Sequence, residues 1–546
     1  MTEAAVFVLV AGAVAVTAIA RRFRWPAPLV LVATGLAVSF VPVIPHFQVD
    51  PHLLLELVLP PLLYSAALSS SYQDFRSALN PITRLGVGLV LVSAAAVALV
   101  AHLLLPGLPF AAALVLGAVV APPDAVAAVA VGRRLGLPRR VMTLLTGESL
   151  INDATSLTLY KVALAGVASG AWALTDALGV FALAVAVGGG IGVGIGLVVH
   201  RIRVHLDDAV VASALGLLTP FAAYWGAEQL GGSGVLAVVA AGLYLGHSSP
   251  EAGFSTRLYE GPLWSTFDLV LESFTFALIG LQLKWVIADV VSSDQGLKRA
   301  ILVATVALAA TLVVRPIYVV ATTWIDTLRL PGSHRPPPDP PSARESVAGS
   351  WAGMRGVVTL AAAAAIPVTS NGGAFPARAT LQLVAYGVAI GTLLLQGLTL
   401  PWVIRALGLG SEEDTSREAS QEAELRLLTA QAAASVLESE TAVLAQDIGP
   451  AATTEVTSTV ALSIEHREET AATVLDPSED TEGLGMHAVD RGRRIHALRR
   501  QTVAAQRAVL MRMRDAGEVD EIVMRRMLRE LDLEEESMSS SWLNRI

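Results

Sequence analysis

Apolar residues recur in long runs along the first three quarters of the chain, and each run is close to the length that crosses a membrane. A transmembrane helix needs about 20 mostly apolar residues. Thirteen runs of this kind predict an all-α polytopic membrane protein with about 13 transmembrane helices. The approximate bounds of the runs are 4–20, 27–45, 52–69, 85–105, 110–132, 142–168, 173–199, 208–226, 233–248, 263–285, 299–321, 346–368 and 379–404.

The pattern changes after Leu409, where SEEDTSREASQEAEL opens a stretch without any run of membrane-spanning length. The middle of this stretch is rich in Thr, Glu and Ala, and its end combines helical periodicity with heavy charge. We expect residues 1–409 to form one transmembrane domain. Residues 410–546 are then a cytosolic, partly flexible helical tail, which is either regulatory or dimerising or a solvated extension without a specific role.

Composition and loop charge agree with a membrane protein and predict its orientation. Charged residues are 16% of the chain, against roughly 25% in soluble domains. Fifteen Lys and Arg residues lie in one set of alternate loops and four in the other. The positive-inside rule places the richer set and the C-terminus in the cytoplasm, and the N-terminus outside. The first run is a retained helix, because its basic residues follow it, whereas a signal peptide has them in front.

One predicted helix carries polar groups that lipid would not tolerate. In GESLINDATSLT (147–158), Glu148, Ser149, Asn152 and Asp153 share one face at helical spacing. Asp153 lies about 16 Å into its span, near the middle of the bilayer. A carboxylate at that depth is by default a functional-site hypothesis. For Glu148, a salt bridge that joins two helices is an equally good interpretation.

Two other spans contain weak points. Pro122 and Pro123 precede Asp124 in AVVAPPDAVAAVAV, and two prolines remove two helical N–H donors. A broken helix beside Asp124 offers carbonyl and carboxylate oxygens to a hard cation. A simple kink capped by Asp124 is compatible with that interpretation. Seven spans later Gly353 and Gly356 flank Arg355, and paired interruptions in two halves indicate a site between inverted repeats.

Buried arginines need partners, and the depths of these residues suggest one. Arg315 lies about 24 Å from the outer end of its span, at nearly the level of Glu148. Arg355 reaches a similar level. We therefore expect Glu148 to pair with Arg315 first, which leaves Asp153 and Asp124 as the groups that titrate. A separate glycine series, Gly188, Gly192 and Gly196, predicts close packing between helices.

Five stretches follow one another along the chain in this order: PPDAVAA, GESLINDATSL, GGSGVLAVVAAGLYLG, LESFTFALIGLQL and WAGMRGVVTLAAA. In these stretches the chain resembles the sodium/proton exchanger branch of the monovalent cation:proton antiporters. The resemblance covers about residues 5–405. It implies a homodimer with a dimerisation domain, and a core domain with two crossing unwound helices. It implies that Asp153 binds cation and proton, that Ser149 and Asp124 contribute to the ion site, and that Asn152 is a structural neighbour.

The resemblance also assigns stabilising charges and leaves one departure. Glu148 with Arg315, and Arg355, match the charged stabilising positions of the family. An Asn-Asp pair is the mark of its electroneutral branch. Family members often have an acidic residue where this chain has Ser65, so one outer ligand is absent at that position and the ion preference is open.

The resulting hypothesis is a secondary transporter of the cell membrane, without a cofactor, that exchanges sodium or another alkali cation for protons. Burial disfavours a bare carboxylate, so Asp153 holds either a proton or a dehydrated cation. A potassium/proton antiporter is the nearest alternative. An intramembrane aspartyl protease using Asp124 and Asp153 lacks its G-x-G-D context, and a cation channel lacks a repeated acidic or carbonyl ring. A nucleotide-binding P-loop is absent from the sequence, and nothing in it indicates binding of nucleic acid.

Overall fold

The computed structural model consists of two compact units, Met1–Gly410 and Ser411–Ile546. In the first unit it describes residues 3–23, 25–42, 54–70, 72–124, 128–129, 132, 135, 137–169, 174–206, 208–249, 254–293, 295–327, 342–370 and 373–409. In the second it describes only isolated positions between 431 and 533. The predicted helical tail therefore lies almost entirely outside the described residues, and its cytosolic location stays a prediction.

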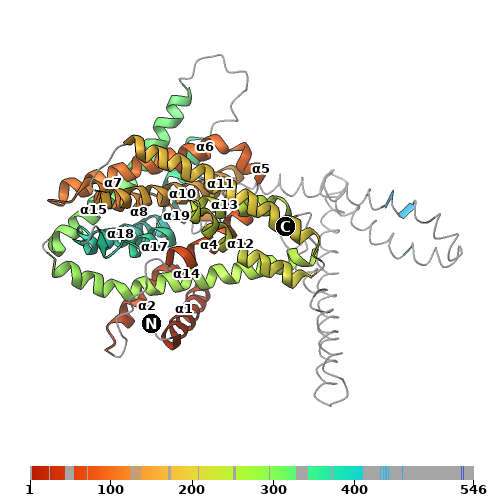
Figure 1. The fold of residues 1–546 in the computed structure, drawn as a ribbon, viewed down its shortest axis with the longest axis horizontal. Coiled ribbons are helices and arrows are strands. Elements are labelled where there is room, and N and C mark those ends of the chain that lie inside the picture. The colour runs from red at the N-terminus through yellow and green to blue at the C-terminus, as the bar shows by residue number, and fades with distance from the viewer. Residues whose placement is uncertain are drawn as a thin grey trace, which may run out of the picture. The chain divides into compact units, whose positions relative to one another are not determined.

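Helices make up nearly all of the first unit (Figure 1). In chain order its elements are α1 (Glu3–Arg22), α2 (Ala27–Ser39), η1 (Leu54–Val58), α4 (Leu59–Leu68), α5 (Tyr72–Ser77), α6 (Leu79–Thr83), η2 (Arg84–Leu89), α7 (Val90–Leu104), α8 (Phe110–Val120), α10 (Arg139–Ser169), α11 (Leu174–Val204), α12 (Ala209–Gln229), α13 (Gly234–His247), α14 (Phe254–Val291), α15 (Gly296–Thr327), α16 (Ala343–Trp351), α17 (Val357–Ala364), β1 (Thr369–Ser370), β2 (Gly373–Ala374), α18 (Arg378–Thr392), η4 (Leu393–Gly397) and α19 (Leu398–Ala406).

Local sequence explains where two of the helices begin. The Asp208 carboxylate accepts hydrogen bonds from the backbone N–H groups of Val210 and Val211, which starts α12. Ser342 and Glu345 form a capping box at the start of α16. The two short strands pair antiparallel, with Thr369 opposite Ala374, and form a small hairpin between α17 and α18.

Six described helical stretches are long and apolar enough to cross a membrane. They are Leu79–Leu104, Gly179–Val204, Ala209–Gln229, Leu258–Val291, Gly296–Thr322 and Arg378–Ala406. Four shorter apolar helices accompany them, at Ala27–Ser39, Glu56–Leu68, Phe110–Val120 and Gly234–His247. The fold is thus mainly helical and built for a membrane, whereas the count of 13 crossings and the inverted repeats stay predictions.

The helices pack in two groups that meet at α14 and α10. The α10 group contains α6, η2, α7, α8, α10 and α15 to α19, and the α13 group contains α1, α2, α4 and α11 to α14. Figure 1 shows α14 as a long helix that runs past both groups, with α1 and α2 beside it. α14 also touches α15, α17 and α18, and α10 touches α4, α11 and α13.

Small residues hold the α13 group together at close range. A side chain on Gly188 or Gly192 of α11 would collide with the backbone of Ser233 or Ala237 at α13, and Gly196 lies against Tyr244. The glycine spacing in the sequence predicts this close packing, and the structure has it between α11 and α13.

Candidate functional site

A stripe of polar side chains lies inside the protein along α10. Asn152 is fully buried, Asp153 is 5% exposed, and Ser156 is buried one turn further on. Ser156 Oγ donates to the carbonyl of Ala118 at 2.7 Å, and Asn152 Nδ2 donates to the carbonyl of Pro123 at 2.9 Å. Both carbonyls belong to the end of α8 and the chain that follows it, so α10 is fastened to α8 by its polar face.

α8 ends as the prolines require. Its last residue is Val120, and residues 121–124 are not helical. In a continued helix the N–H of residue 122 would bond to the carbonyl of Ala118, but Pro122 has no N–H. The Ser156 hydroxyl donates to the Ala118 carbonyl instead. The break therefore leaves carbonyl groups without helical donors. α10 supplies two donors to this region, the Ser156 hydroxyl and the Asn152 side-chain amide.

The second interruption lies next to the first. α16 ends at Trp351, residues 353–356 are extended or irregular, and α17 begins at Val357. The backbone N–H of Asp124 donates to the carbonyl of Met354 at 2.6 Å, so the two interrupted segments touch directly. A side chain on Gly356 would collide with the Asp124 carboxylate, and one on Gly353 would collide with Arg315. Both glycines are needed for this close approach.

Arg355 neutralises the end of α8. The residue is 2% exposed, and its guanidinium donates from Nε to Val120 O at 3.0 Å and from Nη2 to Ala121 O at 3.3 Å. It also bonds to the carbonyl of Gly353, and its backbone N–H donates to Thr392 Oγ1 at 3.0 Å. Because the C-terminal end of a helix carries partial negative charge, a guanidinium is a favourable partner there.

Arg315 makes a bidentate ion pair with Glu148. Nη1 and Nη2 donate to the two carboxylate oxygens at 2.5 and 2.7 Å. The same guanidinium donates from Nε and Nη2 to the carbonyl of Gly349 at 3.2 and 3.1 Å. Both side chains are buried. The pair links α10, α15 and α16, and each charge has a partner of opposite sign as a buried charge requires.

The remaining acids, Asp153 and Asp124, lie close enough to interact electrostatically. Asp124 and Ser149 are half-buried, and Ser149 lies one turn before Asp153 on α10. Asn152 Oδ1 is buried without a hydrogen-bond partner among the described residues. Carboxylate, hydroxyl and amide oxygens are ligands for a hard cation.

In the part of the chain that the structure describes, no three or more His, Cys, Asp and Glu side chains gather as a metal site.

Two acids of α14 were not predicted as site residues. Ser65 Oγ donates to Asp268 Oδ2 at 2.6 Å, and Asp268 Oδ1 is buried without a partner among the described residues. Glu272, one turn along α14, interacts electrostatically with Asp124 and Asp268. A carboxylate therefore lies beside position 65 after all, although it comes from another helix. The signal was present as two acids four residues apart in an apolar run.

Contacts between the two helix groups were also not predicted. Lys161 of α10 forms an ion pair with Glu228 of α12, and Thr158 Oγ1 lies 3.3 Å from Ser233 Oγ, at the start of α13. Within the α13 group, Arg203 pairs with Glu260 in a buried position. Pairing of this kind depends on helices that are far apart in the sequence.

Apolar helices around a charged centre with two interrupted segments define an integral membrane protein of the transporter class. Comparison with known proteins gives the particular family. The chain belongs to the sodium/hydrogen exchanger family, whose transmembrane model matches residues 6–406. This family consists of transporters and not of enzymes, so the intramembrane protease hypothesis has no support. The predicted resemblance to sodium/proton exchangers is confirmed.

Individual relatives agree with this assignment. An uncharacterized Na(+)/H(+) exchanger of Mycobacterium tuberculosis is 32% identical over 96% of this chain and 94% of its own length. The Na(+)/H(+) antiporter ApNhaP of Aphanothece halophytica is 31% identical over 75% of both chains. The sodium, potassium, lithium and rubidium/H(+) antiporter of Bacillus pumilus is 30% identical over 69% of this chain and 57% of its own.

A solved structure shares the fold. The sodium proton antiporter MjNhaP1 of Methanocaldococcus jannaschii superposes with a TM-score of 0.60. It covers 75% of this chain and 98% of its own, with 19% sequence identity. At this identity the similarity shows the fold alone.

Proposed function

We propose that the protein exchanges sodium, or another monovalent cation, for protons across the cell membrane, and that Asp153 is the residue that alternately holds them. The observation that carries this proposal is the burial of Asp153 beside Asp124, where the two interrupted segments meet. Carboxylates inside a membrane mark ion pathways and proton relays. The family supports the substrates, since its members are sodium/hydrogen exchangers.

The proposed mechanism is competition for one site. A bare carboxylate is costly in a water-poor interior, so Asp153 binds either a proton or a dehydrated cation. Ser149 and Asp124 contribute oxygen ligands, and the amide of Asn152 holds the chain at Pro123 in place. Glu148 and Arg315 neutralise each other, and Arg355 is bonded to backbone carbonyls, so these charges serve to hold the helices around the site.

Alternating access requires one part of the molecule to move against another. We assign that movement to the α10 group against the α13 group, in a homodimer whose α13 group forms the contact between subunits. The N-terminus is outside and the C-terminus is cytoplasmic, as the loop charges predict.

Proton flux in proteoliposomes tests the proposal. Purified full-length protein is reconstituted with a pH-sensitive dye inside, and Na⁺, Li⁺ or K⁺ is added outside. We expect Na⁺ to drive an immediate rise of internal pH, because each cation that enters releases a proton to the outside. A response to K⁺ but not to Na⁺ would favour a potassium/proton antiporter. Dye signals equal to those of empty vesicles for all three cations would contradict antiport.

A further inference from the structure

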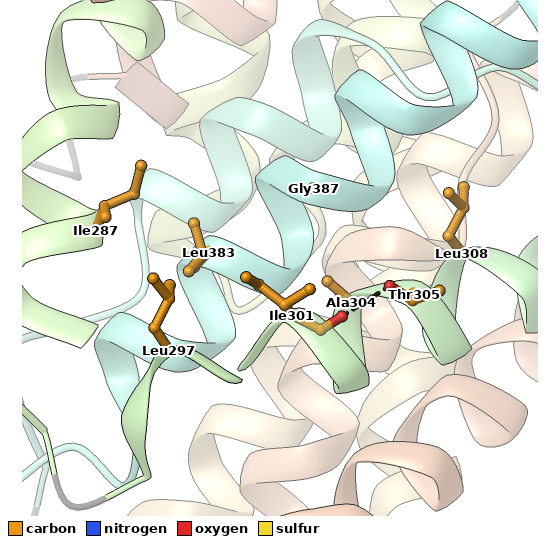
Figure 2. Close-up of a pocket in the computed structure, with 8 residues that line it drawn as sticks. All are labelled: Ile287, Leu297, Ile301, Ala304, Thr305, Leu308, Leu383 and Gly387. Atoms are coloured by element: carbon orange, nitrogen blue, oxygen red, sulfur yellow. Dashed lines mark hydrogen bonds between the residues drawn. The ribbon is translucent and has the colours of Figure 1, made fainter. Parts of the chain in front are cut away.

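A long apolar groove runs between α15 and α18 on the side of the α10 group, with the end of α14 beside it (Figure 2). Its cavity volume is about 400 Å³. Leu297, Ile301 and Leu308 line it from α15, Leu383 lines it from α18, and Ile287 closes one end. Its lining includes only one polar side chain, Thr305, whose hydroxyl is bonded to the carbonyl of Ile301. Water has little to bind in such a groove.

The length of the groove matches one lipid chain. Its lining on α15 extends from Leu297 to Leu308, which is about 16 Å at 1.5 Å per residue. Half of the hydrocarbon core of a bilayer is about 15 Å. The groove begins at the first turn of α15 and ends near mid-membrane, as an acyl chain of one leaflet does. Ile301 is 54% exposed, so the groove is open to the side.

Positive charge lies at the end of the groove where a headgroup would be. Lys298 is exposed and follows the first lining residue of α15. At 100° per residue it is about 75° from the centre of the groove face, whereas Arg299 is nearly opposite. The N-terminal end of α15 adds the partial positive charge of its helix dipole.

Other charged side chains near this end of the groove are bonded to groups elsewhere in the protein. Lys284 Nζ donates to the carbonyl of Ser39 at 3.1 Å, and Arg378 Nε donates to the carbonyl of Ile366 at 2.8 Å. Among the described residues, Asp289 is an acid near this end, and its charge interacts with Arg378. Lys298 is therefore the cation placed beside the groove opening.

We propose that this groove binds one acyl chain of an anionic phospholipid, and that Lys298 holds its phosphate. The site is separate from the ion site and does not depend on the proposed function. It lies between α15, which carries Arg315, and α18, and it borders α14 of the other helix group. A lipid in this position contacts the helices that hold the charged centre, so a change in bilayer composition would change what those helices contact.

Photolabelling in membranes tests the proposal directly. The full chain is reconstituted in vesicles with a trace of phosphatidylglycerol or phosphatidylcholine that carries a photoreactive group on the acyl chain. We expect peptides from Ile301–Leu308 and Leu383–Gly387 to be labelled, and phosphatidylglycerol to label them more strongly. Labelling spread evenly over the lipid-facing helices, or none in these peptides because a second copy of the chain covers them, would overturn the proposal.

Variants separate the chain from the headgroup. Ala304→Phe fills the groove and should remove most of the labelling, whereas Leu302→Phe, on the lipid-facing side of the same helix, should not. Lys298→Gln should lower the preference for phosphatidylglycerol about fivefold, the effect of one basic residue near a membrane surface. Arg299→Gln is its matched control. Equal labelling of Ala304→Phe and the unaltered protein, or equal preference in both charge variants, would overturn the assignment.

Discussion

The two helix groups stabilise themselves by different means. The α10 group buries Glu148, Arg315 and Arg355 and pairs them with one another or with backbone carbonyls. It also buries Asp153, the acid that we propose to hold the proton or the cation. The α13 group is held largely by glycines such as Gly188 and Gly192 that let helices touch backbone to backbone. Buried charges are costly unless each has its partner, whereas glycine contacts carry no such cost. The α13 group also buries an ion pair, Arg203 with Glu260, but the acid that we propose to carry the ion, Asp153, lies in the α10 group beside the two helix breaks.

Replacing the central acid should have the largest effect. Asp153→Asn should abolish exchange while the protein stays folded, because an amide neither binds nor releases the proton. Cation-driven proton flux in proteoliposomes is the measurement. Asp208→Asn is the matched control in the α13 group, since asparagine also caps a helix, and it should keep full activity. Substantial flux through Asp153→Asn would show that another group carries the proton.

The sequence predicts the chemistry of the α10 group better than its contacts. Lipid excludes charge, so the periodicity around Asp153 already indicates which face of the helix is buried. Pro122 and Pro123 likewise predict the end of α8. Depth in the membrane also indicates Glu148 as the partner of Arg315, and the structure has this pair. The partners of Arg355 could not be predicted, because a carboxylate and a set of carbonyls both satisfy a guanidinium.

Two other contacts between distant helices could not be predicted from the sequence. Arg355 bonds to Val120 and Ala121, and Ser65 to Asp268, across more than 200 residues of chain. Helical spacing gives the face of each residue but not the helix that packs against it. The glycine series from Gly188 is an exception, because close backbone packing is a property of the spacing itself.

Locking the two groups together should also stop transport, but reversibly. Thr158 Oγ1 and Ser233 Oγ are 3.3 Å apart, and the chain contains no cysteine. Short side chains at this distance suit a disulfide, so Thr158→Cys/Ser233→Cys should cross-link α10 to the start of α13 on oxidation. If the groups move against each other, oxidation removes exchange and a reductant restores it. The two single variants under the same oxidant are the controls, and full exchange in the cross-linked protein would show no movement at this contact.

Breaking the charged pair of the α10 group should lower stability by an intermediate amount. Glu148→Ala or Arg315→Ala leaves its partner buried and unpaired, which typically costs about 3–5 kcal/mol. The double variant should cost less than the two single losses together, as measured by thermal or chemical unfolding. Lys161→Ala and Glu228→Ala provide the contrast, since an exposed pair contributes about 0–1 kcal/mol. Strict additivity for Glu148 and Arg315 would contradict their coupling.

The smallest expected effect is that of membrane voltage, which should be zero. If Asp153 alone alternates between proton and cation, and Asp124 keeps one protonation state, each half-cycle moves the same charge and one cation exchanges for one proton. The measurement is flux in proteoliposomes with a clamped potential and no pH difference. Asn152→Asp sharpens the test, because an aspartate there adds a second titratable group beside the site. We expect voltage to leave the unaltered protein unchanged and to stimulate Asn152→Asp if that acid cycles. Stimulation of the unaltered protein would instead mean that Asp124, or an acid of α14 such as Glu272, exchanges protons during the cycle.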